Sequence, residues 1–159
     1  MAHELGFAYI KSEGIGGECE EEVYDELAKN DLEIVYIKDL FVSYLKLRQH
    51  QPILFDIKGD LNDIWKIQGA ARLIGSTVRS MLILGDDSID KTFAIKQDIR
   101  KRYVLPCEFD RENEMSYPNF MHAADNRAQV ENDVRVLIPD KLEYLRAVNG
   151  INEIDEQVW

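Results

Sequence analysis

With 159 residues, 45% of them hydrophobic and 31% charged, the chain has the composition of one folded, soluble domain, so we expect a single domain over residues 1–159. Its formal net charge of −11 repels phosphate backbones and acidic lipids, so we expect neither nucleic acid nor a membrane as a partner. No apolar run reaches membrane length and the start has no leader-like pattern, which predicts a cytoplasmic protein.

The first part of the chain predicts two strands on either side of a helix. Aromatic and β-branched residues over 7–10 predict a strand, and a glycine-rich stretch then breaks the chain. Residues 20–22 are all glutamate, which suits the positive end of a helix dipole, and Val23 and Leu27 repeat at helical spacing. A second strand is expected over 32–42.

The middle of the chain predicts helices around a third strand. Residues 43–76 are mostly helical, with pieces near 43–50 and 60–75, and a strand follows over 77–87. Ser88 is expected to cap a helix over 88–103 whose apolar residues lie three or four apart.

A short strand and two helices are expected in the last part. An extended stretch ends at His122, and Asn126 with Gln129 resembles a capping box for a helix over 127–136. A short helix and an acidic tail follow. This order predicts an α/β (α+β) fold of the ferredoxin-like split βαβ kind, with helices covering a four-stranded, mainly antiparallel sheet.

Three segments of the chain share a pattern with a known family. The strand in "FAYIKSEG" ends at Lys11, the helix in "IKQDIRKRY" bears Arg100, and "NFMHAADNRAQVENDV" spaces Asn119, His122 and Asp125 ahead of a helix. Together they resemble the nucleoside diphosphate kinase family, whose opening strand ends in Lys-Pro-Asp-Gly and whose signature is Asn-x-x-His-Gly-Ser-Asp. The resemblance spans most of the chain.

The resemblance implies a phosphotransferase in which His122 accepts the γ-phosphate of a nucleoside triphosphate and passes it to a nucleoside diphosphate. Neutral imidazole is a nucleophile at cellular pH, and two successive displacements let one site serve donor and acceptor in turn. The expected cofactor is Mg²⁺ bound through the nucleotide phosphates, with no metal bound by the protein itself. The family likeness also predicts a homo-oligomer.

The same resemblance assigns roles to the residues around the histidine. Lys11 and Arg100, with Arg111 as an approximate second arginine, would bind phosphates, because negative charge spreads over the phosphoryl oxygens in the transition state. Asn119 would bond a sugar hydroxyl. A carboxylate from the following helix would orient the histidine: Asp133 falls in register, and Glu131 is the near alternative.

Each of these residues also has an ordinary interpretation, and the motifs depart from the family. His122 would fill a strand end, Arg100 would complement a helix dipole, and Asp133 would lie on a solvated helix face. His50 has no supporting pattern. Ala123 and Ala124 replace Gly-Ser, and the loop before the histidine is shortened. The alternative function is therefore a catalytically weak or inactive nucleotide-binding or interaction module of the same fold.

Overall fold

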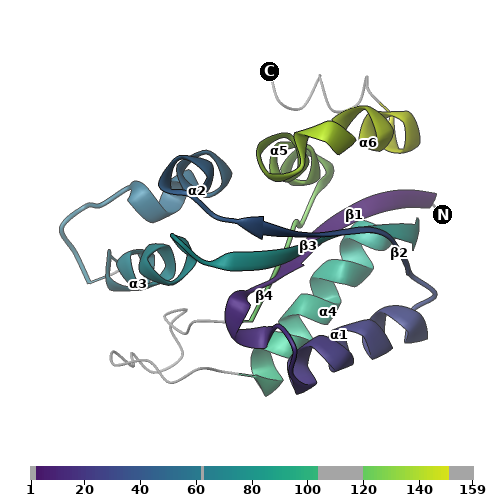
Figure 1. The fold of residues 1–159 in the computed structure, drawn as a ribbon, viewed down its shortest axis with the longest axis horizontal. Coiled ribbons are helices and arrows are strands. Elements are labelled where there is room, and N and C mark those ends of the chain that lie inside the picture. The colour runs from purple at the N-terminus through teal and green to yellow at the C-terminus, as the bar shows by residue number, and fades with distance from the viewer. Residues whose placement is uncertain (1–2, 62, 104–119, 151–159) are drawn as a thin grey trace.

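The strands of the computed structural model, which describes residues 3–61, 63–103 and 120–150, form one sheet (Figure 1). The sheet order is β2-β3-β1-β4, and every paired strand is antiparallel to its neighbour. The strands are β1 (His3–Ile10), β2 (Glu33–Phe41), β3 (Thr77–Asp86) and β4 (Met121–Ala123). The predicted α+β fold with a four-stranded antiparallel sheet is confirmed.

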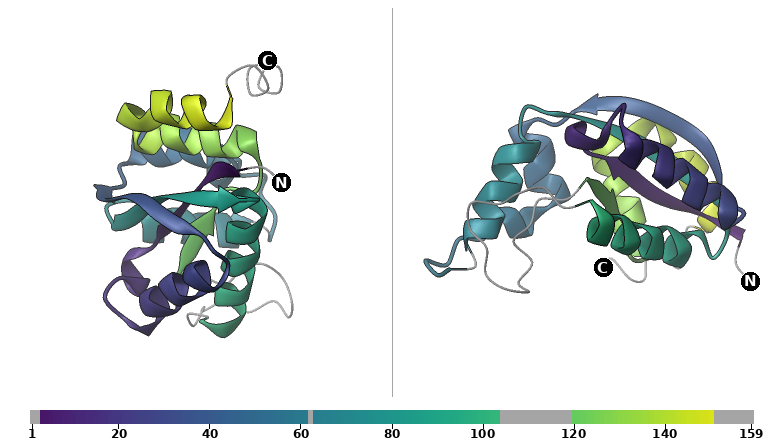
Figure 2. Two further views of the ribbon diagram at one scale, coloured as in Figure 1. Left: turned by 90° about the vertical axis from the view of Figure 1, so that its right-hand side faces the viewer. Right: turned by 90° about the horizontal axis from the view of Figure 1, so that it is seen from below.

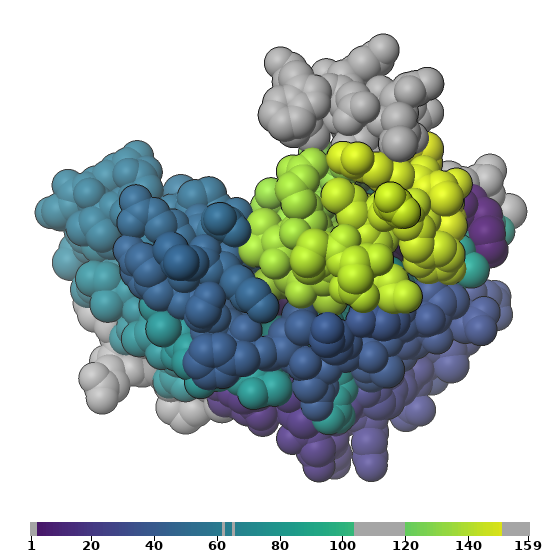
Figure 3. Space-filling model, turned by 45° about the horizontal axis from the view of Figure 1, so that its top comes forward, coloured from purple at the N-terminus to yellow at the C-terminus, as the bar shows by residue number. Residues whose placement is uncertain are grey.

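Helices cover both faces of this sheet. In Figures 1 and 2, α1 and α4 lie together on one face, and α5 and α6 lie on the other. Figure 3 shows from above how α5 and α6 cover the sheet, with the segment of α2 and α3 next to α5. The helices are α1 (Glu18–Lys29), α2 (Tyr44–His50), α3 (Asp63–Leu73), α4 (Ser88–Arg102), α5 (Arg127–Leu137) and α6 (Leu142–Asn149), and short 3-10 turns occupy Ser12–Gly14, Pro52–Phe55 and Pro139–Lys141.

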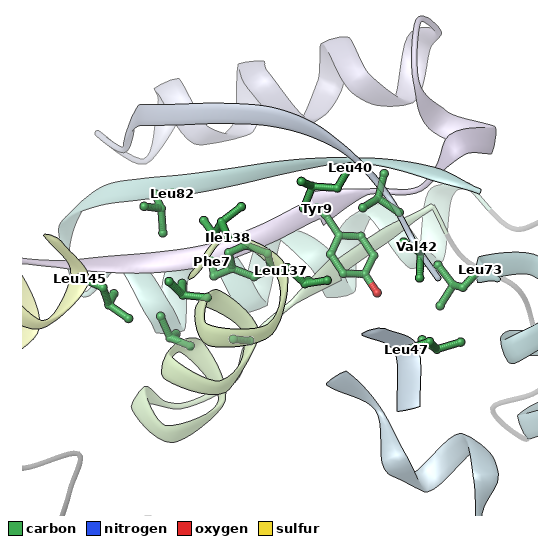
Figure 4. Packing of buried hydrophobic residues seen from close by; sticks show 14 of the residues in the cluster. Phe7, Tyr9, Leu40, Val42, Leu47, Leu73, Leu82, Leu137, Ile138 and Leu145 are labelled. Carbon is green, nitrogen blue, oxygen red and sulfur yellow. The ribbon is translucent and has the colours of Figure 1, made fainter. Parts of the chain in front are cut away.

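Alternating side chains of β1 divide the core in two. Phe7 and Tyr9 point to the α5 face, where they join a buried cluster with Leu47 of α2 and Leu137 of α5 (Figure 4). Ala8 and Ile10 point to the opposite face, toward the buried residues of α1 and α4. Because β1 is central and apolar on both faces, burial of its side chains fixes the register in which β3 and β4 pair with it.

The strand β4 lies at one edge of the sheet and is held along its whole length by β1. Its residues pair with Ala8, Tyr9 and Ile10. The N–H of Lys11 donates to the carbonyl of Phe120 at 2.7 Å, and the N–H of Ala124 donates to the carbonyl of Phe7 at 3.1 Å. The expected strand that ends near His122 is therefore present, and α5 follows it after a short turn.

The two predicted helix caps have different outcomes. The side chain of Asn126 accepts a hydrogen bond from the backbone N–H of Gln129 at 2.8 Å, as predicted for the start of α5. The predicted cap at Ser88 is wrong: the N-cap is Asp87, in the left-handed region with φ 51°, and Ser88 is the first residue of α4. The Ser88 hydroxyl instead donates to the carbonyl of Ile83 at 2.6 Å.

The reason for this difference is the close approach of β1 to the start of α4. A Cβ atom at Gly6 would lie 2.9 Å from the Ser88 hydroxyl oxygen and 3.3 Å from the Ser88 carbonyl oxygen, so a larger residue would force β1 or the start of α4 to shift. The hydroxyl turns into the space between the strand and the helix and is buried there.

Among the described residues, no helix has both the length and the apolar character needed to cross a bilayer.

Candidate active site

His122 is the middle residue of β4 and lies directly across from Tyr9 on β1. Its ring stacks on the Tyr9 ring, with 4.7 Å between centroids and an angle of 26° between planes. Only 16% of the side chain is exposed. Strand pairing thus fixes the backbone of His122, and the stacked phenol fixes the plane of its imidazole.

The carboxylate of Asp133 orients the imidazole of His122. Its Oδ2 lies 2.8 Å from His122 Nε2, and its Oδ1 lies 2.7 Å from His50 Nδ1. Asp133 is one of the two candidates for this position, and α5 turns it inward, where it is 3% exposed. One carboxylate on α5 therefore joins imidazoles from β4 and α2.

Glu131, the other candidate, lies on the other side of α5, because residues two apart on a helix point in nearly opposite directions. Its side chain is buried and accepts a hydrogen bond from Arg146 of α6 at 2.6 Å. Arg135 also approaches the same oxygen, at 3.4 Å. The geometry thus assigns Glu131 to the contact between α5 and α6, away from the imidazole.

The protonation states follow from burial and from these contacts. Burial lowers the pKa of His122 to about 4, against the opposing effect of Asp133, so the ring is neutral near pH 7. Burial alone would raise the pKa of Asp133, but the contacts with His122 and His50 outweigh it and lower the pKa to about 2. An ionised Asp133 accepts the Nε2 proton of His122. The lone pair of that ring then lies on Nδ1.

His122 lines a pocket of about 360 Å³, and so does Gln51, whose side chain is the neighbour of Nδ1. The Nδ1 atom lies 3.5 Å from the side-chain nitrogen of Gln51, which is a long and weak contact. The pocket spans the edge of the sheet at β4, and its lining comes from the end of α2, from α4 and from α5: His50, Gln51, Phe93, Lys96, His122 and Asn132 are among the lining residues. An unprotonated imidazole nitrogen at a pocket wall is placed for nucleophilic attack.

Lys96 lines this pocket, and two further cations, Lys11 and Arg100, interact with it electrostatically. Burial, followed by the charge of Arg100, lowers the pKa of Lys11 to about 8, and the same two causes lower the pKa of Lys96 to about 8. Burial also lowers the pKa of Arg100. The charge of Lys11 acts on His122 as well. A buried arginine that lowers the pKa of two lysines, in a chain of net charge −11, favours the binding of an anion there.

Of the predicted pair, Arg100 acts electrostatically on Lys11, and Lys11 acts electrostatically on His122. Lys96 matches no motif in the sequence, and its only signal is that it precedes Arg100 by one helical turn on α4. Its Nζ lies 4.1 Å from the centre of the Phe93 ring, at the pocket wall. Arg111 and Asn119, the other two predicted ligands, lie outside the described residues.

His50 is the second site residue that no sequence pattern indicates. It is the last residue of α2 and is buried, and 83 positions separate it from Asp133. Its other ring nitrogen, Nε2, lies 3.0 Å from the Tyr9 hydroxyl. This contact depends on how α2 packs against α5 and β1, which local spacing does not reveal.

His50, His122 and Asp133 also form a donor set that transition metals use, with their potential ligand atoms within 4.8 Å of one another. Each imidazole, however, lies at hydrogen-bonding distance from a different oxygen of Asp133. The three side chains can therefore bond to one another without a metal ion. The set does not suit Mg²⁺, which prefers oxygen ligands. Asp125, an exposed carboxylate that lines the pocket, is an oxygen donor of the kind that Mg²⁺ prefers.

Three solved structures with a similar fold are nucleoside diphosphate kinases. An apo cubic form from Encephalitozoon cuniculi aligns with a TM-score of 0.65 and 15% identity over 98% of both chains. An orthorhombic form from Aquifex aeolicus gives 0.63 and 12%, covering 84% of this chain and 93% of the other. A transition-state mimic from Borrelia burgdorferi, with bound vanadate and ADP, gives 0.56 and 18%, covering 84% and 85%.

The expected resemblance is therefore confirmed at the level of the fold. No protein-family model matches the chain, and no curated protein sequence does. At identities of 12% to 18%, the likeness to these structures shows a shared architecture. What the site does has to be argued from its own side chains.

Proposed function

We propose that this chain is a divergent nucleoside diphosphate kinase, which moves the γ-phosphate of a nucleoside triphosphate to a nucleoside diphosphate through phosphorylated His122. One observation supports this above the others: a buried imidazole, neutral near pH 7 and held through Nε2 by Asp133, lines a pocket together with Lys96, and the charge of Lys11 acts on it. The shared fold with nucleoside diphosphate kinases agrees with it. Lys11, Lys96 and Arg100 are the proposed phosphate ligands, with Arg111 and Asn119 as further candidates.

The transfer takes place in two displacements. In the first, the Nδ1 lone pair of His122 attacks the γ-phosphorus, the bond from phosphorus to the bridging oxygen breaks, and the nucleoside diphosphate leaves with the electron pair. In the second, a terminal oxygen of the acceptor diphosphate attacks, the P–N bond breaks, and its electron pair returns to Nδ1. Throughout, Nε2–H donates to Asp133, whose negative charge offsets the charge of the phosphorylated ring.

The cations bind the phosphates by charge-assisted hydrogen bonds and stabilise the negative charge that spreads over the transferred group. Mg²⁺, when bound through the nucleotide phosphates, would neutralise further charge, and the exposed carboxylate of Asp125 in the pocket lining would suit it as a ligand. The charge of Asp125 also acts on Lys96, so both groups belong to the same site.

The experiment that tests this function is phosphoryl labelling. The protein is incubated with γ-labelled ATP and Mg²⁺, and the label is expected to be acid-labile, stable in alkali, and removed by added nucleoside diphosphate. His122→Ala is expected to take up no label. His3→Ala is the matched control, because His3 is an exposed histidine at the far end of β1 and its loss should leave the labelling unchanged.

The alternative function makes a different prediction in the same assay. A nucleotide-binding module without transfer would remain unlabelled, while millimolar nucleotide would still raise its melting temperature. The replacement of a Gly-Ser pair by Ala123 and Ala124 motivates this alternative. If the protein is not labelled and its melting temperature does not rise with nucleotide, the remaining hypothesis is a protein-interaction module of the same fold.

We also propose that the chain self-associates. Among the described residues, no strand pairs with the outer edge of β2, and Ile37 and Phe41 on this strand are 48% and 60% exposed. Leu45, at the start of α2, is 68% exposed. Analytical ultracentrifugation tests this: Phe41→Glu is expected to shift the protein toward monomer, and an equal sedimentation of both proteins as monomers would contradict it.

A further inference from the structure

His50 makes three contacts that have no explanation in the proposed transfer itself. Its Nδ1 lies 2.7 Å from Oδ1 of Asp133, and its Nε2 lies 3.0 Å from the hydroxyl of Tyr9. Its ring also meets the His122 ring edge to face, with 4.7 Å between centroids and an angle of 88°. The side-chain amide nitrogen of Gln51 also lies 3.3 Å from His50 Nε2, and the His50 side chain is only 1% exposed.

The proton positions along this chain of contacts can be deduced one after the other. Burial raises the pKa of Tyr9 well above its ordinary value, so the hydroxyl keeps its proton and can donate it to Nε2 of His50. The Nδ1 of His50 then holds the ring proton and donates it to Asp133. The remaining oxygen of Asp133 accepts the proton on Nε2 of His122. In this assignment each hydrogen bond from Tyr9 through His50 and Asp133 to His122 has one donor and one acceptor.

His50 keeps the carboxylate of Asp133 available as an acceptor. Burial raises the pKa of Asp133, and the interactions with the two imidazoles counteract it. Without the His50 N–H, one carboxylate oxygen would be buried and unpaired, which favours the protonated acid. A protonated Asp133 would donate to Nε2 of His122. The His122 proton would then move to Nδ1, and the nucleophilic lone pair would be lost from the pocket side.

We propose that His50 is a positioning residue: through the carboxylate of Asp133, and with Tyr9 behind it, it keeps the His122 proton on Nε2 and leaves Nδ1 free to react. This inference rests on the proposed phosphoryl transfer by His122. It adds a second histidine to the site, one that takes no phosphate and acts only through its neighbour.

The first test uses the wild-type protein and nitrogen NMR on isotope-labelled histidine, which reports which ring nitrogen holds the proton. Signals are assigned by comparison with His50→Asn and His122→Asn. The expected result is a proton on Nδ1 of His50 and on Nε2 of His122. A His122 proton on Nδ1, or a neutral His50 with its proton on Nε2, overturns the proposal.

The second test compares two substitutions of the same residue. His50→Leu removes the donor and keeps apolar packing, whereas His50→Asn keeps an N–H close to the place of Nδ1. At saturating nucleotide, His50→Leu is expected to slow phosphohistidine formation about 10- to 100-fold and to move the His122 proton toward Nδ1. His50→Asn is expected to recover the rate to within about tenfold of wild type.

The outcomes separate this inference from the function on which it rests. If His50→Leu forms phosphohistidine at the wild-type rate with its His122 proton still on Nε2, the positioning role fails while the transfer stands. If the wild type forms no phosphohistidine, the proposed function fails. The NMR spectra then still show whether His50 determines which ring nitrogen of His122 holds the proton. Thermal unfolding shows whether each variant is folded. If His50→Leu does not fold, the proton positions in the wild-type protein test the proposal by themselves.

Discussion

The side chain of Asn149 bonds both backbone groups of Leu5, 144 positions earlier in the chain. The Leu5 N–H donates to Asn149 Oδ1 at 2.8 Å, and Asn149 Nδ2 donates to the Leu5 carbonyl at 2.9 Å. On its other side, Leu5 pairs with β3. Because β4 pairs with β1 only at positions 8–10, the side chain of Asn149 takes the place of a neighbouring strand at Leu5 and attaches α6 to the sheet.

Removal of this amide is expected to destabilise the protein. Asn149→Ala leaves a buried N–H and a buried carbonyl without partners, at a cost of about 2–4 kcal/mol in the free energy of unfolding. Urea denaturation measures the change. Glu143→Ala, at an exposed position of the same helix, is the control and should change stability by less than about 0.5 kcal/mol. Equal stability of the two variants would show that water or a shifted side chain replaces the amide.

The low pKa of His122 predicts how its ring titrates. Since burial lowers this pKa to about 4, the ring is expected to stay neutral, and therefore nucleophilic, as the pH falls from 8 to 5.5. Its NMR signals should move only as the pH approaches 4. A midpoint near the ordinary value of about 6.5 would mean that the ring is hydrated in solution.

Lys96 is expected to bind phosphate although no sequence motif marks it. Lys96→Met removes a buried charge from the pocket wall and should weaken nucleotide binding about tenfold, which corresponds to about 1.4 kcal/mol. Isothermal titration calorimetry measures the affinity. Lys101→Met is the matched control, since Lys101 is an exposed lysine on the same helix, and it should leave the affinity within about twofold. The same loss in both variants would point to a general effect of charge.

The lysine pKa values near 8 predict that nucleotide binding takes up protons. In the free protein, Lys11 and Lys96 lose protons as the pH rises through about 8, and bound phosphates raise both pKa values by opposing charge. Binding at pH 8.5 should therefore take up protons, binding at pH 6.5 should not, and affinity should fall above pH 8. Calorimetry in two buffers of different ionisation heat counts the protons. A binding heat that does not depend on the buffer at pH 8.5 would refute this.

Much of the fold is predictable from local spacing, and the site is predictable only in part. Asp133 lies 11 positions from His122, on the helix that follows its strand, so one pattern contains both. His50 and Lys96 join the site through packing of α2 and α4 against the sheet edge, which no local spacing encodes. Ser88 is a similar case, since the contact with Gly6 and not the capping preference decides where its hydroxyl points.

The shortness of β4 makes the whole site dependent on a single alignment of two strands. Side chains alternate along a strand, so sliding β4 by one residue past β1 would turn His122 to the α4 face and bring Met121 or Ala123 against Tyr9. Three paired residues alone resist such sliding weakly. The two flanking bonds, from Lys11 to Phe120 and from Ala124 to Phe7, lock the strand in place at both ends. A substitution that breaks either flanking hydrogen bond would therefore let His122 move away from Tyr9 and Asp133, although every side chain of the site would still be present.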